Sequence, residues 1–187
     1  MSVIKLLLGF SPWLAFLLIA HGSLFRLKLG VMVAFALSII MGITKLHRGI
    51  ILWVGLAFFL YATIAVVIFE NLWTAKHMGV IANGVLALFT WFTILIKKPF
   101  TLEYAKAETD PSVWKHPVFM QINYVLSATW GGVFSLNTLL ALGKMQNFLL
   151  PEVAYDGMSH VFLIGAVIFN SWYPKQVRRR LKQEPDS

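Results

Sequence analysis

The sequence predicts an all-α membrane protein, a polytopic bundle of about six transmembrane helices. Of its 187 residues 58% are apolar and only 13% charged, whereas soluble domains carry roughly 25% charged residues. The apolar residues are gathered in long runs. Because each helix that crosses a bilayer needs about 20 residues, the chain has room for at most about seven spans and none for a soluble catalytic domain.

The apolar runs place six helices, near residues 6–24, 29–44, 50–72, 78–96, 118–142 and 157–173. They predict turns at residues 25–28, 45–49 and 73–77 and longer loops at 97–117 and 143–156. We expect residues 1–174 to form a single transmembrane domain and residues 175–187 a basic cytoplasmic tail.

The distribution of Lys and Arg predicts the orientation. With six spans, twelve basic residues fall on the face that holds both termini and the 97–117 loop, and four fall on the other face. Because cytoplasmic loops are enriched in Lys and Arg, both termini are expected in the cytoplasm. The basic residues beside the spans are expected to contact lipid headgroups, and those assigned this role are Lys97, Lys98, Arg178, Arg179 and Arg180.

The 97–117 loop carries helix signals of its own. Thr101 is a candidate cap, and Pro111 and Pro117 are suited to open a helical turn and the fifth span. Phe100, Tyr104 and Ala107 follow a helical spacing, which predicts a short amphipathic helix on the cytoplasmic leaflet. A solvated connector with one helical turn is the alternative.

Composition excludes several functions. The chain has no cysteine, so thiolate chemistry and cysteine-ligated metal centres are absent. Its formal charge of +8 reflects topology and attraction to anionic lipid, and no nucleic-acid partner is expected.

A set of metal-ligating residue types is expected at the outer face. These residues end or begin four predicted spans, and they are His21, Glu70, His77 and His160. Imidazole and carboxylate groups suit a divalent metal, and two facing histidines suit haem. Ordinary headgroup contacts remain the favoured interpretation, so no cofactor is expected.

The fifth predicted span is the most polar. Its polar and aromatic residues recur on one helical face, which predicts a helix at the centre of the bundle, with Gly131 and Gly132 allowing close approach and amides bonding to neighbours. A solute-lining role is the alternative. We define the intramembrane polar stripe as residues of this span together with their expected partners, Asn83 and Asn170, on other helices. The span itself contributes Asn123, Ser127, Trp130 and Asn137.

The same region carries a family resemblance. The Lys97-Lys98-Pro99 segment, Val113-Trp114, and then Asn123, Trp130, Phe134 and Asn137 resemble the bacterial intracellular septation protein A family, or a sister family of uncharacterised membrane proteins. Nine positions separate Trp114 from Asn123 here, more than in the family pattern. The resemblance implies a multi-pass protein of the bacterial inner membrane with a role in the cell envelope or division, and it supplies no catalytic residues.

Three functions remain open. The favoured one is a non-enzymatic envelope protein that acts through lipids and other membrane proteins, or through a homo-oligomer. The second is a small-molecule transporter or substrate-capturing subunit. The third is a haem- or metal-binding subunit of a redox complex.

Overall fold

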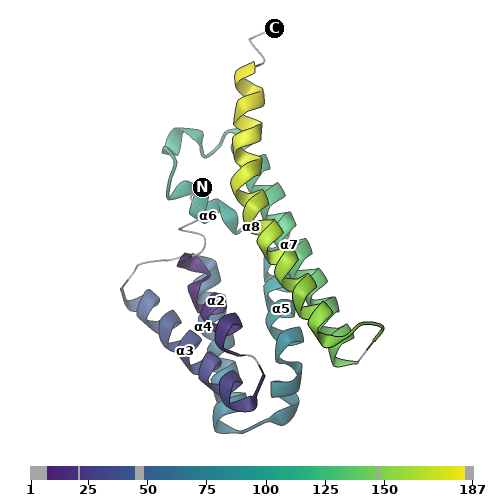
Figure 1. Cartoon of the computed structure of the whole chain (residues 1–187). Coiled ribbons are helices and arrows are strands. Elements are labelled where there is room, and N and C mark those ends of the chain that lie inside the picture. The colour runs from purple at the N-terminus through teal and green to yellow at the C-terminus, as the bar shows by residue number, and fades with distance from the viewer. Residues whose placement is uncertain (1–7, 21, 45–48, 147, 184–187) are drawn as a thin grey trace. The chain divides into compact units, whose positions relative to one another are not determined.

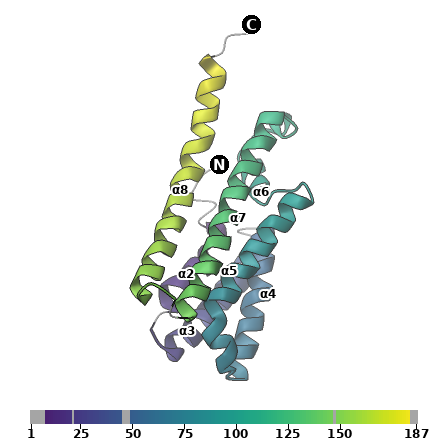
Figure 2. The ribbon, with the colours of Figure 1, turned by 90° about the vertical axis from the view of Figure 1, so that its right-hand side faces the viewer.

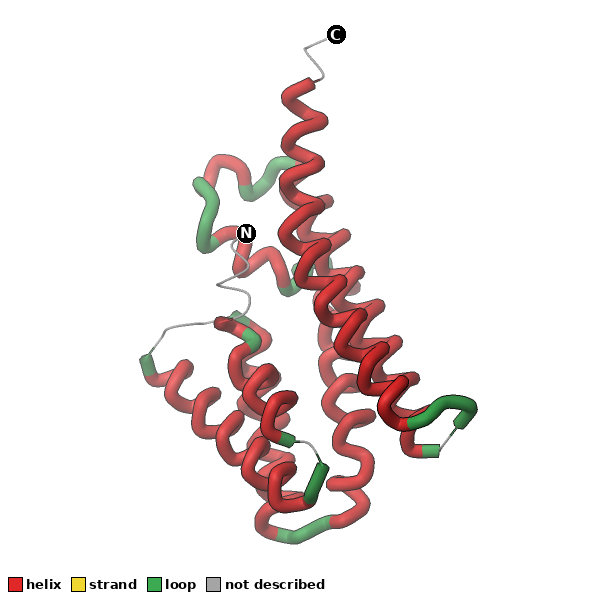
Figure 3. Tube along the Cα trace, in the orientation of Figure 1, coloured by secondary structure: helices red, strands yellow, loops and turns green. Residues whose placement is uncertain are grey.

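The computed structural model describes residues 8–20, 22–44, 49–146 and 148–183, with side chains described up to Arg180. Within these residues the chain is helical and has no β-strand (Figures 1 and 3). The elements in chain order are α2 (Ser11–Ile19), α3 (Leu24–Ile43), α4 (Ile50–Ala62), the π-helix η1 (Thr63–Ile68), α5 (Leu72–Leu95), α6 (Thr101–Lys106), the 3-10 helix η2 (Pro111–Val113), α7 (Pro117–Met145) and α8 (Glu152–Gln183). The all-α class is confirmed.

Five helices in the described part of the chain are long and apolar enough to cross a membrane. They are Leu24–Ile43, Ile50–Ile68, Leu72–Leu95, Pro117–Met145 and Glu152–Arg180. These correspond to the last five of the six predicted spans. The first predicted span begins outside the described residues, and the described residues within it include the nine-residue helix α2, so a sixth crossing stays a prediction.

Several helix boundaries differ from the predictions in the same way. The predicted turn at residues 25–28 is the first part of α3, and residues 73–77 belong to α5. The last helix does not stop at residue 173 but continues past Pro174 to Gln183, so most of the predicted tail is helical. Apolar runs report the part of a helix that fits in hydrocarbon, and helical hydrogen bonding continues beyond it.

Local signals explain where these longer helices begin. The Ser23 hydroxyl accepts a hydrogen bond from the Arg26 backbone N–H at 3.2 Å and caps α3. The Asn71 side chain accepts from the backbone N–H of Thr74 at 3.0 Å, which caps α5 in the same manner. Polar caps thus place both starts several residues before the apolar run.

Two of the three helix signals predicted in the 97–117 loop are confirmed, and the third is wrong. Pro111 begins η2 and Pro117 begins α7, as expected. Thr101 begins α6 but does not cap it, because its hydroxyl bonds to α7 instead.

The described residues fall into two compact units, residues 8–85 and 86–183, here called the N-terminal and C-terminal units; the boundary lies within α5. Each unit is described by itself. That residues 1–174 act as one transmembrane domain stays a prediction.

The N-terminal unit is held by an aromatic cluster. The Trp13 ring of α2 stacks on Phe58 of α4, with ring centroids 4.9 Å apart, and lies equally close to Phe59. Phe16 adds contacts to the same two rings. A Cβ at Gly55 would lie only 3.0 Å from Nε1 of Trp13, so this glycine lets the indole approach the backbone of α4.

The C-terminal unit is built on an antiparallel pair, α7 and α8, which lie side by side in both views (Figures 1 and 2). Near their connection, a Cβ at Gly143 would lie 2.9 Å from the Tyr155 ring, so the tyrosine packs directly on α7. The last part of α5 packs on the middle of α7, where Trp91 donates a hydrogen bond to the Ser135 hydroxyl at 3.1 Å.

Candidate functional site

The polar face of α7 is buried. Asn123, Ser127, Trp130 and Asn137 are each at most 5% exposed, and Asn170 of α8 is equally buried. In a membrane helix such residues are costly unless they find partners. Their contacts therefore indicate what this face does.

At one end of the face, the polar residues hold α6. The Thr101 hydroxyl donates to the Asn123 backbone carbonyl at 2.9 Å and lies 3.0 Å from the Ser127 hydroxyl. The Thr101 backbone N–H also donates to the Ser127 hydroxyl, at 3.3 Å. These bonds tie the connector after α5 to the side of α7.

In the middle of the face, Trp130 donates a hydrogen bond from its indole N–H to Asn170 Oδ1 of α8, at 3.4 Å. This joins two of the residues assigned to the stripe. Asn83, also assigned to it, instead donates to the Gly79 carbonyl of its own helix at 2.9 Å.

The two glycines of α7 play different parts. A Cβ at Gly131 would lie 3.0 Å from Trp91 and 3.2 Å from Thr90, so α5 approaches closely here. At Gly132 a Cβ would meet nothing within 4 Å. The expected close approach thus depends on Gly131, and the expectation for Gly132 is wrong because that position points away from α5.

Some buried polar atoms of the C-terminal unit have no hydrogen-bond partner among the described residues. They include Thr90 Oγ1, Asn123 Oδ1, Asn137 Oδ1 and Asn170 Nδ2. Unpaired buried amide atoms cost free energy, so these positions are where water or a polar solute would be stabilised.

Two of the predicted metal ligands have other partners. Glu70 pairs with Lys28, and His77 stacks on Trp73 with its Nδ1 2.7 Å from the Trp73 carbonyl. Within the described ranges no three His, Cys, Asp or Glu side chains gather to hold a metal. His21 lies outside those ranges, so the full set and its haem alternative stay predictions.

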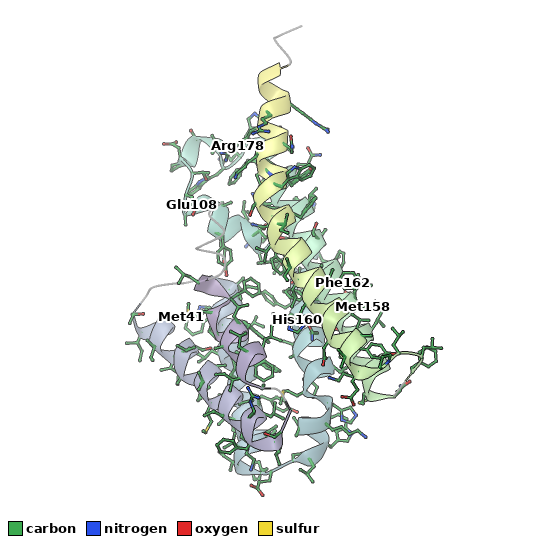
Figure 4. All side chains as sticks on the ribbon, viewed as in Figure 1. Met41, Glu108, Met158, His160, Phe162 and Arg178 are labelled. Carbon is green, nitrogen blue, oxygen red and sulfur yellow. The ribbon has the colours of Figure 1, made fainter. Side chains whose placement is uncertain are left out.

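His160, the fourth member of that set, lies on α8, where its Nδ1 is within hydrogen-bond distance of the Asp156 carbonyl. Figure 4 shows it near Met158, toward the start of the helix.

Two ion pairs that sequence reasoning missed stabilise helix connections. Lys28 of α3 pairs with Glu70 in the turn before α5, and this partner lowers the pKa of the Glu70 carboxyl. Lys144 of α7 bonds both oxygens of Asp156 on α8, at 2.9 and 2.8 Å. Hydropathy could not find either pair because each joins helix ends that come together only in the fold.

The residues assigned to lipid headgroups are exposed at one end of the C-terminal unit. Lys97 and Lys98 follow α5, and Arg178, Arg179 and Arg180 lie on the last turns of α8. Figure 4 places Arg178 toward the end of α8 opposite to Met158 and His160. We call this the basic end.

The connector at the basic end is packed against protein. Phe100 and Tyr104, expected to face lipid, are 0% and 2% exposed, and Ala107 is exposed. Burial, with a smaller effect from Glu103, raises the pKa of the Tyr104 hydroxyl well above its usual value. Trp114 closes the connector by donating to the Thr109 carbonyl at 3.2 Å.

Together the helices define the class as a multi-pass, all-α membrane protein whose polar groups gather on one buried helix face and at the helix ends. No protein-family model matches the chain. Comparison with the curated proteins and with the solved structures found no match.

Proposed function

We propose that this chain is a non-enzymatic protein of the bacterial inner membrane that serves the cell envelope or cell division through contacts with lipids and other membrane proteins. It crosses the membrane six times, with both termini and the 97–117 connector in the cytoplasm. The observation that carries the proposal is the use of the polar face of α7 for packing: Thr101, Ser127 and Trp130 bond within the chain. The basic residues of the basic end are exposed, so they are available to contact lipid.

Helix length supports the lipid contact. The 32 residues of α8 rise about 48 Å, whereas the hydrocarbon core is about 30 Å thick. Because Lys and Arg are costly in hydrocarbon, we place the excess length at the basic end. The arginines are thereby held beside the phosphates of the adjoining leaflet.

The lipid contact is tested by the triple change Arg178→Gln, Arg179→Gln and Arg180→Gln. We expect the purified variant to retain less anionic phospholipid than the parent protein, measured by mass spectrometry of co-purified lipid. A matched control is Lys76→Gln, which removes a basic residue of α5 in the N-terminal unit. Equal retention by the triple variant and the parent would contradict the lipid role.

The orientation is tested with single cysteines, since the chain has none of its own. Ser112→Cys lies in the connector and Gln146→Cys in the α7–α8 connection. We expect an impermeant thiol reagent to label Cys at 146, but not at 112, on intact cells. The reverse result would invert the topology.

The envelope role is tested in cells that lack the protein. We expect altered cell length or septum placement, restored by the parent gene. Normal length and septa under envelope stress would count against this role.

A substrate-capturing subunit is the second candidate, and the unpaired buried atoms Asn137 Oδ1 and Asn170 Nδ2 favour it. A bound polar solute would satisfy these groups. Native mass spectrometry of the purified protein tests this candidate: a small molecule retained by the parent and lost in Asn137→Leu would support it over the non-transport role.

A further inference from the structure

The connection between α7 and α8 presents an exposed apolar tip at the end opposite to the basic end. We define the apolar tip as Phe148, Leu149, Leu150 and Val153, which are 59%, 84%, 44% and 81% exposed. Soluble loops of this length are normally polar, with turn-forming residues. An apolar tip therefore needs an apolar or amphipathic environment.

The backbone of the apolar tip is held in an unfavourable conformation that displays its side chains. Leu149 has a φ of 60°, in the left-handed region that a branched non-glycine residue rarely adopts. It is also the most exposed of the four residues. Such conformations persist only where the surroundings fix them.

Several contacts hold the base of the apolar tip. Lys144 bonds both carboxylate oxygens of Asp156 across the base of the tip, and the Phe148 backbone N–H donates to the Gly143 carbonyl at 3.0 Å. The Tyr155 ring packs on Gly143 just behind. Lys144 also lies 3.9 Å from the Glu152 carboxylate, so it offsets part of the acidic charge at the base of the tip.

Helix length fixes the depth of the apolar tip. Trp172 and Tyr173 are the aromatic residues that directly precede the basic end, as expected at a membrane interface. The segment from Glu152 to Tyr173 rises about 33 Å as helix, close to the thickness of the hydrocarbon core, about 30 Å. The apolar tip thus lies at the level of the opposite interface.

We propose that the apolar tip is a membrane-surface anchor that inserts Phe148, Leu149 and Leu150 into the headgroup and acyl boundary of the leaflet opposite to the basic end. Lipid is its occupant because both helices that carry it cross the membrane and its depth matches the interface. The α7–α8 pair is then fixed on both faces, by charge at one end and by apolar side chains at the other.

The anchor is tested by nitroxide labelling in vesicles of phosphatidylcholine and phosphatidylglycerol that contain only this protein. Single labels are placed at Leu149→Cys, at Ser112→Cys as the aqueous reference, and at Val161→Cys on the exposed face of α8 as the hydrocarbon reference. Collision rates with oxygen and with a neutral nickel chelate, present on both sides of the membrane, report depth.

We expect the oxygen-to-nickel ratio at 149 to exceed that at 112 severalfold and to lie below that at 161. A ratio at 149 equal to that at 112 would overturn the anchor. Low collision rates with both reagents would also overturn it, because they would show that a second copy covers the apolar tip. Labels at Leu150→Cys and Val153→Cys repeat the test should the change at 149 disturb the turn.

Discussion

The two units of this protein hold their helices together by different means. In the N-terminal unit Trp13 packs against the rings of both Phe58 and Phe59. In the C-terminal unit buried polar side chains bond between elements, from Thr101 to α7 and from Trp130 to α8, beside the close packing at Gly131 and Gly143. Without a hydrophobic driving force in lipid, helices associate through close packing and through hydrogen bonds. The comparison shows that buried aromatic packing dominates the N-terminal unit, whereas the C-terminal unit adds hydrogen bonds between its elements to close packing.

The largest expected effect is in the aromatic cluster. Trp13→Ala removes a 4%-exposed indole and should lower the free energy of unfolding by about 3–5 kcal/mol. Thermal melts followed by circular dichroism in detergent measure the loss. Trp53→Ala is the matched control, because Trp53 on α4 is 61% exposed. Equal melting temperatures for the two variants would refute the aromatic packing.

Close packing in the C-terminal unit is tested by two neighbouring glycines. Gly131→Leu places a side chain against Trp91, at 3.0 Å already for the Cβ, and should cost about 1–3 kcal/mol of stability. Gly132→Leu points into open space and should cost little. If thermal melts rank the two variants in the opposite order, the close approach of α5 to α7 is wrong.

The hydrogen bonds of the C-terminal unit should matter less than the aromatic cluster. Thr101→Val removes the hydroxyl that bonds to Asn123 and Ser127 and should cost about 1 kcal/mol. Thr129→Val is the control, since that hydroxyl bonds only to the Val125 carbonyl of its own helix. If Thr101→Val lowered the free energy of unfolding as much as Trp13→Ala does, the proposed difference between the two units would be wrong.

The smallest expected effect is on the loss of stability at low pH, through the Lys28–Glu70 ion pair. Because Lys28 lowers the pKa of Glu70 in the fold, the unfolded chain binds more protons near pH 4.5 and the pair stabilises the protein above that pH. The contribution disappears as the pH falls through the lowered value. Lys28→Met should therefore remove part of the loss of melting temperature between pH 6 and pH 3. An unchanged pH dependence would show that the pair has no role in stability.

Sequence patterns found the spans and the buried side of α7, and they failed at the helix ends. The apolar runs located each of the five candidate spans, and the spacing from Asn123 to Asn137 marked residues that are buried. The predicted turns at residues 25–28 and 73–77 were wrong. Hydropathy does not detect the side-chain caps at Ser23 and Asn71, which begin the helices before the apolar runs.

The candidate metal set stays a prediction. Its members were chosen because they end or begin spans at one predicted depth, but depth says nothing about lateral neighbours. In the fold Glu70 has Lys28 as its partner, and His77 lies on Trp73.

By itself the sequence determined that this chain is helical and suited to a membrane. Apolar runs of span length are unfavourable in water, and in lipid a helix satisfies its own backbone hydrogen bonds. Only the tertiary structure decided which polar groups meet. Thr101 bonds to α7 rather than capping its own helix, Gly131 rather than Gly132 admits a neighbour, and Lys144 finds Asp156. These choices depend on the rotation of each helix about its axis, which a pattern along one chain leaves open and which packing between helices fixes.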